Sequence, residues 1–201
     1  SAENKSKTWA VAAGGSVSTG RAAAEGAYAS NNGTNDIEAI VDKYETKNEQ
    51  GVVTYSRNNT ISNANNISIT AKDNTVEKGI AGSIAVAAGK DTVASIGGAV
   101  VYNNIGNSAT DKQTVKAQLN NAAITTVNNA TLQVKAINDA DFLGLALGGA
   151  VRASTDGNSP LGISAQGSVA VSTAYMDTIA GMENVKIDET SGSQTSKVEV
   201  E

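Results

Sequence analysis

The sequence predicts an all-β fold in which parallel strands stack into a solenoid, and three observations predict it. The same short markers recur three times in the same order, and Val17, Val86 and Val151 of the first marker are 69 and 65 residues apart. Each repeat ends in a segment in which apolar and polar residues alternate. The apolar content of 40% comes mainly from Ala, Val and Ile. Repeats of this kind stack because one unit alone cannot bury its apolar face.

The repeat units cover residues 8–75, 76–139 and 140–201. Units of roughly 55 to 75 residues are long for one coil and suit three coils of roughly 20 to 25 residues each. We therefore expect a single β-helical segment over residues 1–201 with about eight or nine rungs. The polar start and the interrupted alternation at the end indicate a segment excised from a longer protein.

The closing segment of each unit predicts a strand with one buried face. Apolar and polar residues alternate with period two at residues 66–71, 131–136 and 184–188. The residues expected on the buried face are Ile67, Ile69, Ala71, Leu132, Val134, Ala136, Val185 and Ile187.

The blocks at residues 81–88 and 143–151 are apolar at nearly every position. This pattern fits strands that are buried on both faces, or strands packed against a second layer or a partner. A short buried helix fits as well, because periodicity alone does not separate the two.

Residues 37–44 also fit two patterns. Their apolar residues have the i, i+3, i+4, i+7 spacing of an amphipathic helix, but Ile37, Ala39 and Val41 alternate as in a strand. The corresponding residues of the other two units lie next to alternating segments, so we predict a strand here.

Asparagine pairs mark the ends of these segments. The pairs are Asn31-Asn32, Asn58-Asn59, Asn65-Asn66, Asn103-Asn104, Asn120-Asn121 and Asn128-Asn129. Asn tolerates left-handed backbone conformations and bonds to the main chain in turns. We expect Asn side chains at one corner of successive coils to stack into a ladder.

The first unit is longer than the others because of an insertion near residues 43–57. Loops that leave a rigid scaffold often carry recognition. Tyr44 and Tyr55, with Arg57 nearby, combine residue types that are common at interaction hot spots, so they are the predicted binding residues. In the alternative, both tyrosines fold back and seal the loop against the solenoid.

Catalytic chemistry has few residues to use. Without His or Cys, the Ser-His-Asp and Cys-His sets are impossible and the usual zinc ligands are missing. We therefore expect no catalytic residue, no metal and no cofactor. A polysaccharide-processing enzyme could still use acidic residues. The candidates are Asp139 and Asp141 beside Phe142, or Asp36, Glu38 and Asp42. Our first interpretation places these acids on solvated faces or in turns.

Charge and hydropathy limit the partners. The net charge is −5 and the 15 basic residues are scattered, so no nucleic acid is expected as a partner. The longest apolar stretch, residues 142–151, is about half the roughly 20 residues that a membrane-spanning helix needs. Trp9 is expected to cover the first coil. The strands exposed at the ends of the solenoid are a candidate site of self-association.

The segments GSIAVAAG, LALGGAV, GAVVYNNIGN and VKAQLNNAAITTVNNATLQVKA resemble the repeats of the leukotoxin-type filamentous adhesin family, which are very large Gram-negative autotransporter passengers. The resemblance covers essentially the whole chain and lies in the texture of the repeats rather than in a catalytic motif. It implies a right-handed parallel β-helix at the bacterial cell surface, or secreted from it, that acts in adhesion or in host-cell damage. The insertion near residues 43–57 departs from this pattern.

These observations favour a non-enzymatic scaffold that binds a host-cell surface protein or glycan and contributes to virulence. A β-helical polysaccharide-processing enzyme is the alternative, and acidic and basic side chains that converge in one groove would favour it. A membrane-active toxin segment that uses the apolar blocks is a third hypothesis.

Overall fold

The computed structural model describes residues 1–42, 44–47, 50, 53–56, 59–90, 93–154, 162–190 and 197–201. Every helix or strand in these ranges is a β-strand, which confirms the predicted all-β class. Residues 36–41 form a strand, so the strand predicted from the repeat is confirmed there and the helical spacing is not used. The apolar blocks at 81–88 and 143–151 are strands as well, which rules out the helical alternative.

The strands form three parallel sheets and one antiparallel hairpin. Sheet A contains β1 (Ala2–Asn4), β4 (Asp36–Val41), β7 (Asn59–Asp73), β10 (Gln113–Asn138), β13 (Met176–Glu189) and β14 (Lys197–Val200). Sheet B contains β2 (Lys7–Ser18), β8 (Val76–Gly89) and β11 (Asp141–Ser154). Sheet C contains β3 (Ala22–Gly33), β9 (Val93–Ile105) and β12 (Gly162–Ala174). The hairpin consists of β5 (Tyr44–Lys47) and β6 (Val53–Ser56).

Corresponding strands of successive units lie side by side in parallel. Lys7 of β2 pairs with Val76 of β8, and Val76 pairs with Asp141 of β11. These offsets of 69 and 65 residues equal the spacing of the repeated valines. Each unit therefore makes one circuit of the stack, an arrangement compatible with a β-solenoid.

The predicted number of about eight or nine rungs is wrong, because sheets B and C hold three strands each. The physical reason is the length of the strands. Strands β8 and β11 run for 14 residues without a corner, and β10 continues for 26 residues through two bends. Each unit contributes one long strand to sheet B and one to sheet C. These long strands take up so many residues that one unit suffices for only one circuit of the stack.

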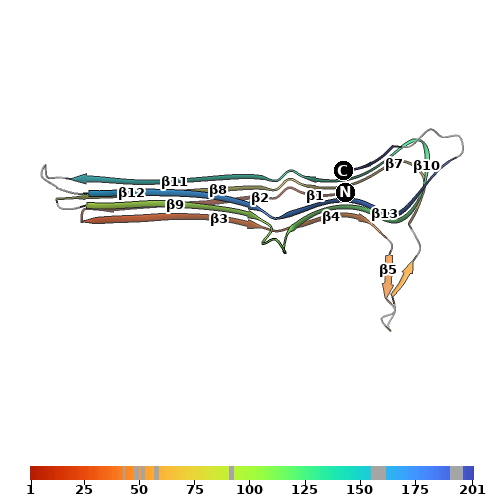
Figure 1. The fold of residues 1–201 in the computed structure, drawn as a ribbon, viewed down its shortest axis with the longest axis horizontal. Coiled ribbons are helices and arrows are strands. Elements are labelled where there is room, and N and C mark those ends of the chain that lie inside the picture. The colour runs from red at the N-terminus through yellow and green to blue at the C-terminus, as the bar shows by residue number, and fades with distance from the viewer. Residues whose placement is uncertain are drawn as a thin grey trace.

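Sheets B and C form a straight body with two layers, which we call the arm (Figure 1). Its interior is made mainly of Ala, Gly and Ser, together with Val93 and Val101 of β9. The Ser83 hydroxyl donates to the main-chain oxygen of Gly98 at 2.6 Å, and the Ser95 hydroxyl donates to that of Ala85 at 2.7 Å. Both bonds run between β8 and β9, so the two layers lie close enough for a serine to reach the opposite main chain.

The strands of sheet A form the other half, which we call the head (Figure 1). Within the long strand β10, Asn121 and Asn129 have left-handed φ angles of 50° and 59°. These bends bring residues on both sides of them into one apolar core. The core includes Ile37, Ile69, Ala71, Val115, Ala117, Leu119, Ala122, Ile124, Leu132 and Val134, all at most 8% exposed. The buried faces predicted for the closing segments are thus confirmed, with Val185 and Ile187 packed against this core.

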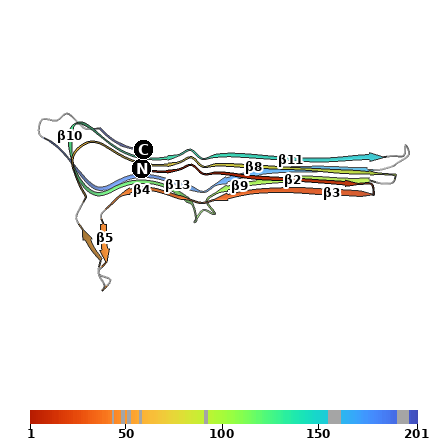
Figure 2. The ribbon, with the colours of Figure 1, turned by 180° about the vertical axis from the view of Figure 1, so that it is seen from behind.

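The hairpin of β5 and β6 leaves the head and projects to one side, as Figures 1 and 2 show. It lies within the insertion that the sequence places near residues 43–57. The hairpin interrupts the first unit between β4 and β7, and both of these strands still pair with β10.

Asparagine ladders connect successive repeat units, as predicted. The amide-to-amide bonds are Asn31 to Asn103 at 2.9 Å, Asn104 to Asn32 at 2.9 Å and Asn184 to Asn121 at 2.8 Å. Each bond joins equivalent positions of successive units, so the amides add side-chain hydrogen bonds along the stack to those of the main chain.

Candidate functional site

The structure places two of the three predicted binding residues in the hairpin. Tyr44 is the first residue of β5 and Tyr55 lies in β6, where the register pairs it with Glu45. Arg57 lies outside the described residues. The main chain therefore carries both tyrosines on an element that projects from the head (Figure 2).

The base of the hairpin is held by Asp42, which lies between β4 and β5. Its carboxylate accepts a hydrogen bond from the Asn121 amide at 2.8 Å, and its main-chain oxygen accepts one from the Asn59 amide at 2.7 Å. Asn59 begins β7, where the chain re-enters the head. Asn121 also bonds to Asn184 of the next repeat unit. The two ends of the insertion are therefore fixed to a ladder of Asn side chains that runs along the stack.

The two sets of acids considered for enzyme chemistry lie in different parts of the fold, one on or beside β4 and the other at the start of β11. Asp139 lies 3.0 Å from the ammonium group of Lys72 in an ion pair, and Asp36 accepts a main-chain N–H of β10 at 3.2 Å. Asp141 begins β11 in sheet B, whereas Glu38 lies in β4 of sheet A. In the described part of the chain, no three side chains of Asp, Glu, His or Cys are arranged to hold a metal ion.

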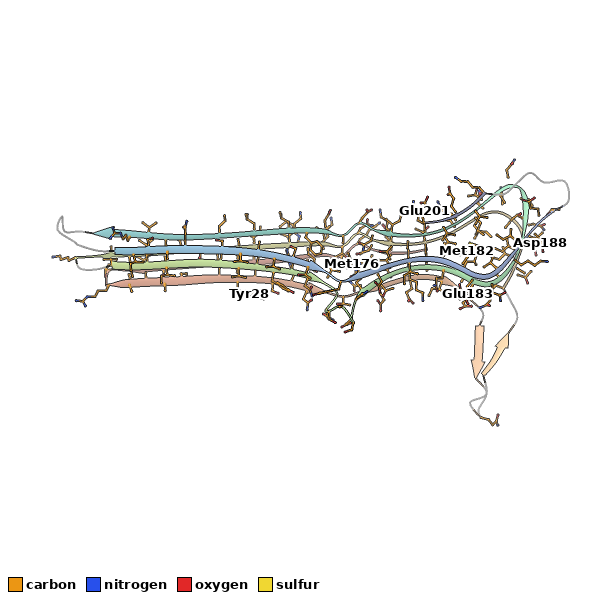
Figure 3. All side chains as sticks on the ribbon, in the orientation of Figure 1. Tyr28, Met176, Met182, Glu183, Asp188 and Glu201 are labelled. Carbon is orange, nitrogen blue, oxygen red and sulfur yellow. The ribbon has the colours of Figure 1, made fainter. Side chains whose placement is uncertain are left out.

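Large apolar side chains cover both outer faces of the arm, and Figure 3 shows side chains, including Tyr28, standing out along it. We call these surfaces face B, on sheet B, and face C, on sheet C. The large exposed residues of face B are Trp9, Val11, Val17, Ile84, Leu143, Leu145, Leu147 and Val151. Those of face C are Tyr28, Ile96, Val100, Ile163, Val169 and Val171.

The expectation that Trp9 covers the first coil is wrong, because the side chain is 62% exposed. Trp9 lies on the outward side of β2, next to Lys78 of β8. The ammonium group of Lys78 is 4.9 Å from the centroid of the indole ring, within the range of a cation–π contact. This pair marks the end of face B nearest the head.

Each face has a shallow furrow where small residues of three strands align. The furrow of face C has a volume of about 460 Å³ and runs over Gly26, Gly98 and Gly167. The furrow of face B has a volume of about 480 Å³ and contains Gly82 and Gly149.

Polar side chains fill the junction between arm and head, where β7 ends and β8 begins. Asp73 is fully buried, and its carboxylate accepts hydrogen bonds from Asn4 at 3.0 Å, Thr75 at 2.7 Å and Gln113 at 2.6 Å. The donors come from three segments of the chain, so this carboxylate ties β1 and β10 to the end of β7.

Glu77 lies in the same junction but has no such partners. The side chain is fully buried, and neither carboxyl oxygen has a well-formed hydrogen bond in the described structure. Burial raises the pKa of Glu77 from 4.5 to about 7, and the main-chain amide of Asn104 opposes this with a smaller effect. The neighbours of Glu77 in sheet B are Thr8 and Phe142, neither of which carries a charge.

Sequence reasoning did not find the two outer faces or the junction. The signal for the faces was present in β2, β8 and β11, where small and large residues alternate. The small residues face inward in all three strands, whereas the general rule that large apolar residues are buried predicts the opposite orientation.

Comparison of the chain with family models, with curated proteins and with solved structures finds no match. The described residues contain no helix that is long and apolar enough to cross a membrane.

Proposed function

We propose that this chain is a non-enzymatic scaffold and interaction segment of a secreted or surface-displayed bacterial adhesin or leukotoxin-like exoprotein. In this proposal the stack is a right-handed parallel β-helix, and its partner is a protein or glycan of the host-cell surface. The resemblance of the repeats to the filamentous adhesin family motivates the bacterial setting.

The observation that carries the proposal is the anchored hairpin. A stack of parallel layers gives a rigid support, and one element, β5 with β6, leaves it. Its base is fixed through Asp42 to Asn59 and Asn121. A recognition element that is held at its base loses less conformational entropy on binding than a free loop does. The tyrosines in its strands supply residue types that binding surfaces favour.

Binding of the purified chain to cultured host cells tests this proposal. In the test variant, a short Gly-Ser linker replaces residues 43–58 and joins Asp42 to Asn59. A second variant replaces only Tyr44 and Tyr55 with Ala, which leaves the hairpin backbone in place.

We expect the linker variant to lose cell binding and the Tyr44→Ala, Tyr55→Ala variant to bind at least about tenfold more weakly. Circular dichroism of both variants should match that of the parent, because the head and the arm are retained. Equal binding by the parent and the linker variant would contradict the hairpin as the recognition element.

A further inference from the structure

The junction between arm and head gathers most of the buried side-chain oxygens that lack a hydrogen-bond partner. In the described part of the chain five such oxygens have none, and four of them belong to Thr8, Glu77 and Asn104. The fifth, the hydroxyl of Ser16, lies farther out along the arm. Buried polar atoms are bonded in the great majority of cases, so this concentration of unpaired oxygens indicates a ligand that accepts their lone pairs.

Thr8 and Asn104 lie next to Glu77 on two different strands. Thr8 is the register partner of Glu77 in the neighbouring strand β2, and both residues are on the inward side of sheet B. Asn104 belongs to β9 in the opposite layer, and its main-chain N–H faces the Glu77 carboxylate. Sheets B and C thus each bring one of these residues next to the same carboxylate.

Sheet C is shaped to receive this carboxylate. A Cβ atom on Gly33 of β3 would lie 3.0 Å from Oε1 of Glu77, which is closer than an ordinary contact. Gly33 pairs with Ile105, the residue that follows Asn104 in β9. The carboxylate therefore lies against the main chain of sheet C, at a position where any larger residue would crowd it.

The side chains around Glu77 supply no positive charge. Its neighbours in the sheet, Thr8 and Phe142, are uncharged. Lys7 and Lys78 are adjacent in sequence to Thr8 and Glu77, but they lie on the outward side of sheet B. A buried carboxylate that stays ionised needs a counter-charge, and in proteins this is a basic side chain or a metal ion.

The donor set favours a monovalent ion. A carboxylate, a hydroxyl and an amide oxygen are hard ligands, which suit hard cations rather than transition metals. Calcium sites gain affinity from several charged ligands, and this set has only one. The other buried acid of the junction, Asp73, is not available, because its carboxylate already accepts hydrogen bonds from three side chains. One monovalent cation balances the single charge of Glu77.

We propose that the junction binds one alkali cation, sodium or potassium, between the Glu77 carboxylate, the Thr8 hydroxyl and the amide oxygen of Asn104. The bound ion joins sheet B to sheet C at the place where the arm meets the head. The residues that occupy the position of Glu77 in the other two units are Thr8 and Phe142, so the described units form one such site. The site is separate from the hairpin and does not rest on the proposed function.

Thermal unfolding followed by circular dichroism tests the proposal. The parent is unfolded at about pH 8 in sodium, potassium or choline chloride at equal ionic strength, because choline is too large for a buried site and controls for screening. We expect sodium or potassium to raise the melting temperature above its value in choline. Above the dissociation constant, each tenfold increase in the cation concentration should add about 3 to 6 °C.

Three variants separate the site from general effects of salt. Glu77→Gln removes the charge and should abolish the difference between the alkali salts and choline chloride. The matched control is Glu183→Gln, which makes the same change at an exposed acid of β13 and should keep the difference. Thr8→Val removes one ligand and should raise the cation concentration of half-maximal effect at least about tenfold. Circular dichroism verifies that each variant is folded.

Diffraction from crystals grown in rubidium chloride locates the ion, because rubidium occupies potassium sites and scatters anomalously. We expect an anomalous peak between Glu77 and Thr8. Equal melting temperatures of the parent in all three salts would overturn the proposal, since a proton or water would then satisfy Glu77. Stabilisation by calcium chloride without any by sodium or potassium would also overturn it, because the site would then be divalent.

Discussion

Arm and head are built from the same repeat units but sort their side chains by size in opposite ways. In the head, Leu119, Ile124 and Leu132 point inward and are at most 2% exposed. In the arm, Ala81, Ala85 and Ala87 point inward and are fully buried, while Leu145 and Ile84 point outward. The head gains stability by burying large side chains, whereas the arm relies on main-chain pairing and close contact between its layers.

The largest expected effect is a loss of stability when a large core residue of the head is truncated. Leu132→Ala should lower the free energy of unfolding by about 2 to 5 kcal/mol, because the buried side chain leaves a cavity. The matched change Leu145→Ala in the arm should cost less than about 1 kcal/mol, since that side chain is already 43% exposed. Urea unfolding at low protein concentration measures both. Equal losses would contradict the difference between the two regions.

The next effect concerns Glu77 at the junction of the two regions. Its folded pKa of about 7 lies above the ordinary value of 4.5, so the folded state favours the protonated carboxyl. The contribution of Glu77 to the free energy of unfolding is most favourable below pH 4.5. It declines as the pH rises from 4.5 to 7, and above pH 7 the decline is complete. The shift corresponds to about 3 kcal/mol.

The variant Glu77→Gln cannot ionise and should therefore lack this decline. Chemical unfolding of parent and variant between pH 4 and pH 9 should show a difference that grows between the two pKa values and is constant above about pH 7. Parallel curves for the two proteins would show that Glu77 is not a buried, unpaired acid.

Two adjacent glycines give a sharper test of the close layers in the arm. A Cβ at Gly97 meets the main chain of Gly149, whereas a Cβ at Gly98 has only an ordinary contact of 3.6 Å. Gly97→Ala should cost about 1 to 3 kcal/mol, because the layers must separate. Gly98→Ala should be nearly neutral. Thermal unfolding of the two variants measures the difference, and an equal effect would refute the close packing inferred for the interior.

The smallest effect expected is at the Asn ladder of the head. Asn184 has a φ of 51° and donates to Asn121, so Asn184→Gly keeps the backbone conformation but removes the hydrogen bond. We expect a loss of about 0.5 to 1 kcal/mol in urea unfolding. Asn184→Ala should lose about 1 kcal/mol more, since Ala disfavours the left-handed region. If Ala were tolerated better than Gly, the ladder would not explain this residue.

Much of the head could be predicted from the sequence. Alternation around Ile69 and Leu132 identified both strands and their buried faces, because a strand with one buried face has a pattern of period two. The repeat register also identified β4 as a strand against its helical spacing. These predictions succeeded because large residues at alternate positions give a strong signal.

The arm could be predicted only in part, because its buried residues are the small ones. Residues 81–88 and 143–151 are apolar on both sides, so their pattern does not tell which side is covered. The same uniformity hides the length of the circuit, since no polar corner divides β8 or β11. For the same reasons, the predictions for the position of Trp9 and for the number of rungs were wrong.

The hairpin could be predicted better than the arm but less completely than the head. Comparison of the units located the insertion near residues 43–57, because the other two units are shorter at this point. Its fold, and the role of Asp42 in fixing its base, depend on contacts with Asn121 of the next unit. Such contacts between distant residues are not visible in the pattern of a single unit.

The central claim is that each repeat unit makes one circuit, so that equivalent residues of successive units are neighbours. Cysteines at Val17 and Val86 test it directly, because paired residues of adjacent parallel strands lie about 4.8 Å apart, within the range of a disulfide. Oxidation of the Val17→Cys, Val86→Cys variant should give an intramolecular disulfide, seen as a monomer with changed mobility. The Val17→Cys, Ile40→Cys variant, with the spacing of a coil of roughly 20 to 25 residues, should not form one. A disulfide in the second variant and none in the first would contradict the account.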